Sequence, residues 1–262
     1  MDIWEAIILG IVQGLTEFLP VSSSGHIEIG THILGTNTSE NLKFSLVIHS
    51  ATALSTMVVF RKDLLTILSD LFKFQNNPST NFTFKILLSA IPVGLVGYFF
   101  EDQISVLFGG NIVLVGLMLL VTGMLLALTY FAKPSSGDIN TPRALIMGIA
   151  QTVAIVPGIS RSGATIATAL LMGVDKELAT RFSFIMVLIP IMGASLLKLL
   201  DLTQNPSLSS GISNQALFIG FISAFLSGLV ACSWMIQIVK KGKLIYFALY
   251  CFALGSLSLI LY

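Results

Sequence analysis

The chain has 262 residues, of which 55% are hydrophobic and only 10% are charged. A soluble domain carries about 25% charged residues, so this composition excludes an ordinary soluble protein and favours membrane spans. The formal net charge of +1 and the lack of a long basic run exclude a nucleic-acid partner. The two cysteines, Cys232 and Cys251, fall in apolar segments, which predicts buried side chains without a catalytic role.

Along the chain, the apolar segments are of two kinds. A spanning helix needs about 20 mostly apolar residues. Six stretches qualify: 43–61, 84–101, 108–132, 181–199, 215–239 and 244–262. Two further regions, 1–35 and 142–173, are apolar but are each cut by proline, glycine and a serine cluster. Irregular backbone at membrane depth must be buried in protein, so we expect an all-α polytopic membrane protein with two re-entrant helix pairs.

The distribution of Lys and Arg predicts the orientation of the spans. When the six spans are traced, eleven of the fourteen basic residues fall on one side, two fall on the other, and Arg161 lies within a broken region. We expect the side with eleven to be cytoplasmic, so both chain ends and the acidic pair Glu101 and Asp102 face outward. The larger set is Arg61, Lys62, Lys73, Lys85, Lys133, Arg143, Lys176, Arg181, Lys240, Lys241 and Lys243, and the smaller set is Lys43 and Lys198.

The chain also matches itself in part at an offset of 138 residues, which indicates a duplication. The halves, 1–138 and 139–262, each hold one broken region and three spans. Because three is odd, the second half is inserted upside down, and inverted repeats of this kind place their site where the halves meet. On symmetry alone the chain resembles a transporter. Matching positions include Ser22, Ser24, Gly25, Gly35, Phe44 and Ser45 with Ser160, Ser162, Gly163, Gly173, Phe182 and Ser183.

The first break gathers groups that suit acid–base and nucleophilic chemistry. Gln13 and Glu17 are four residues apart, on one helix face, and Pro20 ends that helix. Serines at 22–24 follow, of which Ser22 or Ser23 can cap the next helix, and His26 lies one turn inside it. A carboxylate in an apolar segment is costly and usually functional. The alternative is a polar cluster that only satisfies broken backbone groups.

The second break has the character of an anion site. Arg161 sits within an apolar region, where it costs roughly 2.5–3.5 kcal/mol on insertion scales, so it needs an anion beside it. Ser160, Ser162 and Thr165 add hydroxyls at a helix start, where free N–H groups attract anions. A guanidinium holds phosphate oxygens bidentately. The alternative is a structural ion pair between Arg161 and Glu17.

Together these motifs resemble those of the undecaprenyl-diphosphate phosphatases, the bacitracin-resistance family. Gln13 to Glu17 resembles the family's (Glu/Gln)-x-x-x-Glu motif, which is followed by a Ser/His segment. Pro157 to Thr165 resembles its Pro-Gly-x-Ser-Arg-Ser-x-x-Thr motif. The resemblance covers the chain in length, repeat and motif order. It implies hydrolysis of undecaprenyl diphosphate to the monophosphate, which recycles the carrier lipid for peptidoglycan synthesis, in the bacterial inner membrane with the site on the outer side.

The resemblance also implies roles for individual residues. The expected catalytic residues are Glu17, Ser23, His26 and Arg161, with either Ser23 or His26 as the nucleophile. A divalent cation, Mg²⁺ or Ca²⁺, is expected with Glu17 as a ligand. Many members have Glu where this chain has Gln13, so this chain lacks one carboxylate that a site with two carboxylates would use. The phosphate-binding set is Gln13, Ser22, Ser160, Ser162 and Thr165.

Other readings stay open at this stage. A lipid-phosphate flippase would explain the inverted repeat without needing the Ser/His/Glu cluster. His32 and His49 lack neighbouring metal ligands in the sequence, and we interpret both as structural. Two further alternatives stay open. Glu28 faces either the site or the outer headgroups, and the protein is either a monomer or a homodimer.

Overall fold

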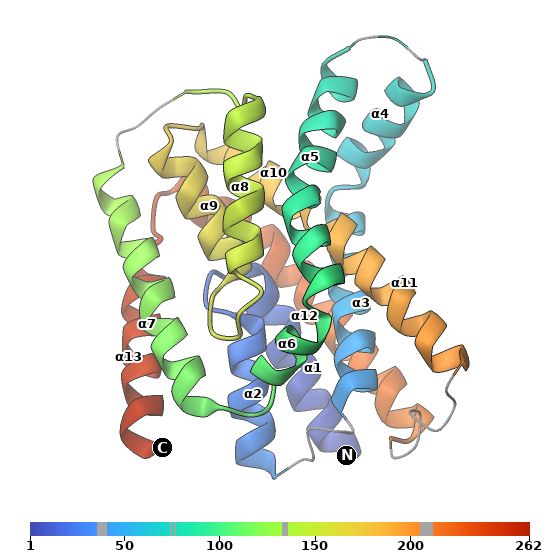
Figure 1. Ribbon diagram of the computed structural model, residues 1–262, viewed down its shortest axis with the longest axis vertical. Coiled ribbons are helices and arrows are strands. Elements are labelled where there is room, and N and C mark those ends of the chain that lie inside the picture. Colours follow the sequence, from blue (N-terminus) through green and yellow to red (C-terminus); the bar gives the residue numbers. More distant parts are fainter. Residues whose placement is uncertain (36–40, 74, 76, 133–135, 205–211) are drawn as a thin grey trace.

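A computed structural model of the chain describes residues 1–35, 41–73, 75, 77–132, 136–204 and 212–262 (Figure 1). Lys133 and the side chain of Lys198, used above to assign the two faces, lie outside the described residues. Helices dominate the described part. Their bounds are α1 Ile3–Phe18, α2 Ser23–Leu34, α3 Asn41–Val59, α4 Arg61–Leu71, α5 Pro78–Phe99, α6 Glu101–Leu107, α7 Ile112–Leu128, α8 Thr141–Val153, α9 Arg161–Leu171, α10 Lys176–Met186, α11 Leu188–Gln204, α12 Asn214–Lys240 and α13 Ile245–Leu261, with a short 3₁₀ turn at Thr129–Phe131.

The expected all-α membrane protein is confirmed. Within the described residues, four helical stretches are long and apolar enough to cross a membrane: Pro78–Phe99, Ile112–Phe131, Lys176–Leu197 and Asn214–Lys240. The helix pair α3 and α4 makes a fifth if it is counted as one span, although it is bent by 76°. The sixth expected span, 244–262, corresponds to α13, an apolar helix of 17 residues.

Each broken region forms a helix pair that turns back near the middle of the molecule. Figure 1 shows α1 and α2 opening toward the end that holds both chain termini, whereas α8 and α9 open toward the opposite end. The helix α1 ends at Phe18, two residues before Pro20, and Ser22 caps α2. In the second region α8 ends at Val153 and α9 begins at Arg161. The two turns therefore meet inside the molecule.

Small residues let the helices around these turns approach closely. A Cβ placed on Gly10 of α1 would lie 2.6 Å from the carbonyl oxygen of Gly220 in α12, so only glycine fits. In the same way, a Cβ on Gly255 of α13 would lie 2.8 Å from Gly116 O in α7. Contacts of this kind are typical of helix packing in membranes. Cys232 and Cys251 are fully buried and unpaired, as predicted.

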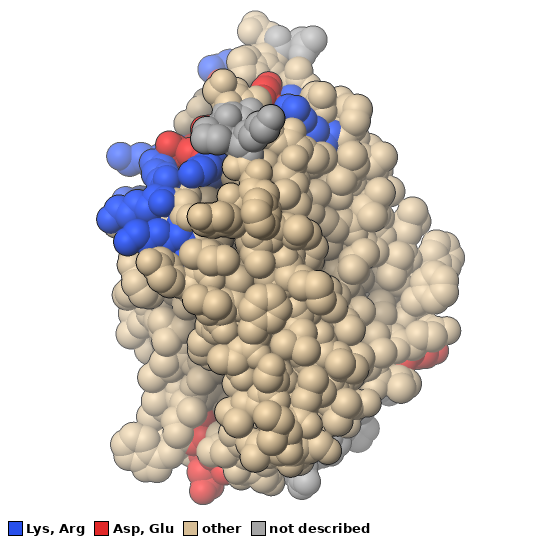
Figure 2. All heavy atoms as spheres, turned by 90° about the vertical axis from the view of Figure 1, so that its left-hand side faces the viewer, with Lys and Arg blue, Asp and Glu red and all other residues tan. Residues whose placement is uncertain are grey.

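Basic residues gather at one end of the molecule. Figure 2 shows Lys and Arg concentrated toward that end of the visible face, whereas acidic residues are visible at both ends. Ion pairs join the helices there: Arg181 of α10 to Asp63 of α4 at 2.8 Å, and Lys240 of α12 to Glu177 of α10 at 2.9 Å. This is the end toward which α8 and α9 open (Figure 1). The sequence-based grouping of these basic residues agrees with the fold.

Candidate active site

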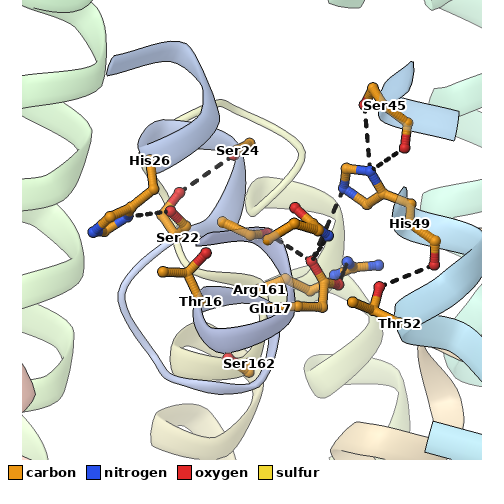
Figure 3. Close-up of polar contacts among 12 residues, drawn as sticks. Thr16, Glu17, Ser22, Ser24, His26, Ser45, His49, Thr52, Arg161 and Ser162 are labelled. Carbon is orange, nitrogen blue, oxygen red and sulfur yellow. Dashed lines mark hydrogen bonds and ion pairs between the residues drawn. The ribbon is translucent and has the colours of Figure 1, made fainter. Parts of the chain in front are cut away.

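The carboxylate of Glu17 is the centre of the site (Figure 3). Gln13, one turn earlier on α1, donates its Nε2 hydrogen to Glu17 Oε2 over 2.9 Å. Ser23, the first residue of α2, donates its hydroxyl to the same oxygen over 2.6 Å. Arg161, the first residue of α9, forms an ion pair with Glu17 Oε1. The Glu17 side chain is only 6% exposed, so its charge is neutralised inside the protein by Arg161.

Backbone-to-hydroxyl bonds fasten the two breaks to each other. Gly158 N donates to Ser22 Oγ over 3.1 Å, which links the second break to the first. Thr122 of α7 accepts from Ser160 N over 3.0 Å and donates to Gly158 O over 3.0 Å. Gly158 has φ +96°, and a Cβ there would lie 2.6 Å from the carbonyl oxygen of Val115, so glycine is required. These contacts fix Arg161 opposite Glu17.

Three of the expected phosphate-binding hydroxyls are used to hold this framework. Ser22 caps α2 by accepting from Gly25 N, and Ser160 caps α9 by accepting from Gly163 N. The Thr165 hydroxyl lies 2.6 Å from another buried hydroxyl and donates to a carbonyl of its own helix. All three residues are nearly fully buried. Their main contribution in this structure is therefore to shape the breaks.

His26 does not join the Glu17 cluster. Its Nδ1 lies 2.8 Å from Ser22 O, and because a carbonyl can only accept, Nδ1 carries the proton. In the neutral ring Nε2 then accepts from the Tyr250 hydroxyl of α13 over 2.7 Å, and the two rings are stacked. In Figure 3 the ring points away from Glu17. The imidazole therefore bonds a backbone carbonyl oxygen rather than a serine hydroxyl.

His49 is the residue that the sequence interpretation missed. Its Nε2 lies 3.9 Å from Glu17 Oε2, and its Nδ1 donates to Ser45 O over 2.8 Å (Figure 3). The interpretation of His49 as purely structural overlooked this position beside the central carboxylate. One feature of the sequence could have indicated it: Ser45 and His49 are polar, lie four residues apart in an apolar span, and so share one helix face. His32, by contrast, is exposed and packs edge-to-face against Tyr262.

The protein offers only one or two side chains near Glu17 that could act as ligands of a cation. No group of three or more His, Cys, Asp or Glu side chains within the described ranges could hold a metal ion. However, Gln13 Oε1 is buried without a hydrogen-bond partner, on the side chain that already contacts Glu17. A hard cation prefers such oxygens and commonly binds through one or two protein ligands plus substrate phosphates. The residues therefore fit a cation that a diphosphate largely coordinates.

A small cavity with both apolar and polar walls adjoins the Glu17–Arg161 pair. Its volume is about 10 Å³, enough for roughly one water molecule. Hydroxyls from α3, α9 and α10 contribute to its wall: Thr52, Thr56, Ser162 and Ser183. Of the expected phosphate-binding residues, Ser162 is the one that lines this cavity beside Arg161.

Fold and site together define a class: a polytopic helical membrane protein whose two broken helix pairs bring a serine hydroxyl, a carboxylate and a guanidinium to one buried point. Comparison with known proteins identifies the family. The family model described as bacitracin resistance protein BacA matches residues 6–257. The chain belongs to this family.

Similar proteins agree with this assignment over nearly their full length. The undecaprenyl-diphosphatase of Christiangramia forsetii is 52% identical, covering 99% of this chain and 98% of that protein. The undecaprenyl-diphosphatase of Bacteroides fragilis is 48% identical, with the same coverage of both chains. The protein of that name from Methanobrevibacter smithii is 37% identical, over 97% of this chain and 96% of its own.

Proposed function

We propose that this protein is an undecaprenyl-diphosphate phosphatase that releases inorganic phosphate from the lipid diphosphate and leaves the monophosphate. The observation that carries the proposal is the 2.6 Å bond from the Ser23 hydroxyl to Glu17, whose other oxygen is paired with Arg161. The names of relatives at 48–52% identity support the same substrate. The activity recycles the carrier lipid for peptidoglycan synthesis and accounts for bacitracin resistance.

Ser23 is the proposed nucleophile and Glu17 its general base. The Ser23 oxygen attacks the terminal phosphorus, its proton passes to Glu17, and the bond to the bridging oxygen breaks. Arg161 stabilises the charge on the transferred phosphoryl group, together with the N–H groups in the first turns of α2 and α9. A water oxygen then bonds to phosphorus, the bond to the Ser23 oxygen breaks, and Ser23 recovers its proton from Glu17 as inorganic phosphate leaves.

His26 is assigned to the leaving group. It lies one turn inside α2, and its Nε2 is paired with the Tyr250 hydroxyl, so a proton can be exchanged within that pair. The Tyr250 proton passes through His26 Nε2 to the departing prenyl phosphate, and one proton of the water that later cleaves the phosphoserine restores it. The alternative, a nucleophilic His26, is less well supported because Nε2 is already bonded to Tyr250 whereas Ser23 already bonds its base.

A divalent cation is part of the proposal. Glu17 and Gln13 Oε1 would hold Mg²⁺ or Ca²⁺ together with the substrate diphosphate. When bound, the cation supplies positive charge that offsets the charge of the phosphates. The remaining contacts of Glu17 with Ser23 and Arg161 place the nucleophile and the phosphate clamp on the same carboxylate.

The proposed architecture has six spans in an inverted repeat, with the site open to the periplasmic side of the inner membrane. Residues that match at the offset of 138 have the same structural role in both halves, which supports the repeat. Ser22 and Ser160 each cap a helix by accepting from the N–H three residues later. Gly35 and Gly173 each follow a helix with positive φ. The opening of α1 and α2 away from the basic end supports an outward site (Figures 1 and 2).

Phosphate release by purified protein in detergent tests the function. We expect release of phosphate from undecaprenyl diphosphate, with loss of activity on chelation and recovery on adding Mg²⁺ or Ca²⁺. A flippase needs no hydrolysis, so folded protein that releases no phosphate in the presence of either cation would contradict the proposal and favour the transport alternative.

A further inference from the structure

Outside the active site, four lysines gather where α12 turns into α13. Lys240 ends α12, and Lys241 and Lys243 lie on either side of Gly242 in the turn. Lys176, the first residue of α10, reaches the same point, because a Cβ placed on Gly242 would lie 2.9 Å from its Nζ atom. We propose that this lysine cluster binds the headgroup of an anionic phospholipid. The proposal does not depend on the phosphatase activity.

Backbone hydrogen bonds fix the positions of the lysines in the turn. Gly242 has φ +68°, and its N–H donates to Val239 O over 2.9 Å. The N–H of Lys243 donates to Ile238 O over 3.4 Å, which completes the pattern with which a glycine commonly ends a helix. These bonds satisfy carbonyl groups of the last turn of α12, so capping this helix does not require the side chains of Lys241 and Lys243.

Ion pairs within the protein do not neutralise the cluster. Lys240 pairs with Glu177 over 2.9 Å. Within the part of the chain that the structure describes, the other three ammonium groups have no carboxylate within ion-pair distance. The neighbouring carboxylate of Asp175 accepts from two N–H groups at the start of α10. Lys241 and Lys243 are exposed, so their charges are available to a ligand.

The cluster lies where the apolar part of the molecule ends. The helix α12 is long and apolar enough to cross a membrane and ends at Lys240, and α13 is also apolar. Trp234 is 55% exposed and lies seven residues before Lys241, on the same face of α12, and Tyr246 beyond the turn is 63% exposed. Exposed Trp and Tyr side chains are typical of the interface between membrane and water. The lysines are therefore at the level of lipid headgroups.

A phospholipid matches both parts of this surface. Its headgroup phosphate supplies negative charge at the level of the lysines, and each lysine near an anionic membrane surface strengthens binding about fivefold. Its acyl chains can lie along the apolar face that includes Trp234, which a soluble anion cannot do. Figure 2 shows such an arrangement at the basic end, where Lys and Arg side chains gather beside a broad uncharged face.

The chain carries a fluorescent reporter at each end, because its two tryptophans are Trp4 and Trp234. Trp4, at the start of α1, is 74% exposed and has acidic residues nearby, Asp2 and Glu5. Phospholipids with brominated acyl chains quench the fluorescence of a tryptophan that they contact. The full-length protein is placed in phosphatidylcholine vesicles with a rising fraction of brominated phosphatidylglycerol, and quenching gives the relative affinity of the two lipids at each reporter.

In Trp4→Phe, where Trp234 alone reports, phosphatidylglycerol should be preferred over phosphatidylcholine by at least about fivefold. In Trp234→Phe, where Trp4 alone reports, neither lipid should be preferred. High salt should weaken the preference at Trp234, because exposed charges are screened. Equal preferences at the two tryptophans, or a preference at Trp234 that salt does not change, would overturn the proposal.

Substitutions in the Trp4→Phe background identify the residues responsible. Lys241→Gln with Lys243→Gln should remove the preference, and Arg at both positions should keep it. Lys62→Gln with Lys73→Gln is the matched control, since it removes two charges at the two ends of α4 and should leave the preference unchanged. A preference that survives both Gln substitutions in the turn would contradict the assignment.

A last measurement separates a lipid headgroup from a soluble anion. Inorganic phosphate and chloride are added at equal ionic strength, and both should weaken the preference at Trp234 to the same extent. A stronger effect of phosphate would assign the lysine cluster to a soluble phosphate and overturn the assignment to a lipid.

Discussion

At the scale of single residues, the proposed mechanism gives the Glu17–Arg161 pair two functions, one after the other. Without substrate, it neutralises an arginine whose insertion in a membrane costs roughly 2.5–3.5 kcal/mol. When a diphosphate arrives, its oxygens compete with the carboxylate for the guanidinium, which is 25% exposed and therefore accessible. The carboxylate then keeps its bonds to Ser23 and Gln13. The pair thus preserves the site in the empty enzyme and releases Arg161 for catalysis.

Arg161→Ala should abolish hydrolysis, with kcat/KM reduced by at least about 1,000-fold, because both the phosphate clamp and the partner of Glu17 are lost. Arg161→Lys should recover little, since an ammonium lacks the bidentate fork. Phosphate release by purified variants measures this. Arg143→Ala, a half-buried arginine near the start of α8 whose guanidinium bonds Asp138 O, is the control and should stay active. Near-normal turnover in Arg161→Ala would rule out the clamp.

Ser23→Ala should eliminate activity because, among the described residues, Ser23 is the one whose hydroxyl donates to Glu17. His26→Gln should leave at most a small residue of activity. A phosphoenzyme trapped from the wild type should be stable in acid and labile in alkali, as phosphoserine is. An acid-labile adduct that persists in Ser23→Ala would instead make His26 the nucleophile.

The sequence predicted the Glu17, Ser23 and Arg161 cluster because polar residues in apolar breaks need one another. The sequence could not distinguish phosphate-binding serines from helix-capping serines, since a serine at a helix start, such as Ser22 or Ser160, suits either role. It also missed His49, whose partner lies on a different helix. Contacts between distant elements are set by packing, which residue spacing alone does not give.

At the scale of elements, the sequence predicted the broken helices well because Pro20 and the serine clusters mark their ends. It did not predict that the helix after 43–61 would continue as α4. The chain bends by 76° at Phe60, and the following helix Arg61–Leu71 is too charged to read as a span. The sequence also did not predict that Thr122 bonds the second break, because this threonine lies within an otherwise apolar span.

Thr122→Val should destabilise the protein, because it leaves the buried Ser160 N–H and Gly158 carbonyl without their hydroxyl partner. Each unsatisfied group costs about 1–3 kcal/mol. We expect a lower melting temperature in detergent and reduced phosphate release, as the second break loosens. Thr129→Val is a matched control on the same segment, since its hydroxyl bonds only a nearby carbonyl, Leu126 O. Equal melting temperatures for the two variants would contradict this role of Thr122.

At the scale of the whole molecule, charge and ion pairs distinguish the two ends. The bonds from Arg181 to Asp63 and from Lys240 to Glu177 tie α4, α10 and α12 together at the basic end. The first helix pair opens at the other end, which is where we propose that a lipid headgroup enters to reach Glu17 (Figure 1). Lys and Arg counts could predict this polarity because they depend on composition near span ends rather than on packing.

Cysteine labelling in intact cells tests the orientation. A cysteine in place of Asp102, at the start of α6, should react with an impermeant reagent from outside. A cysteine in place of Lys73 or Lys241 should react only after permeabilisation, because basic ends remain in the cytoplasm. The native Cys232 and Cys251 are fully buried, so the unmodified protein serves as the unlabelled control. The reverse pattern would open the Glu17 site to the cytoplasm, and hydrolysis at the outer face would have to be abandoned.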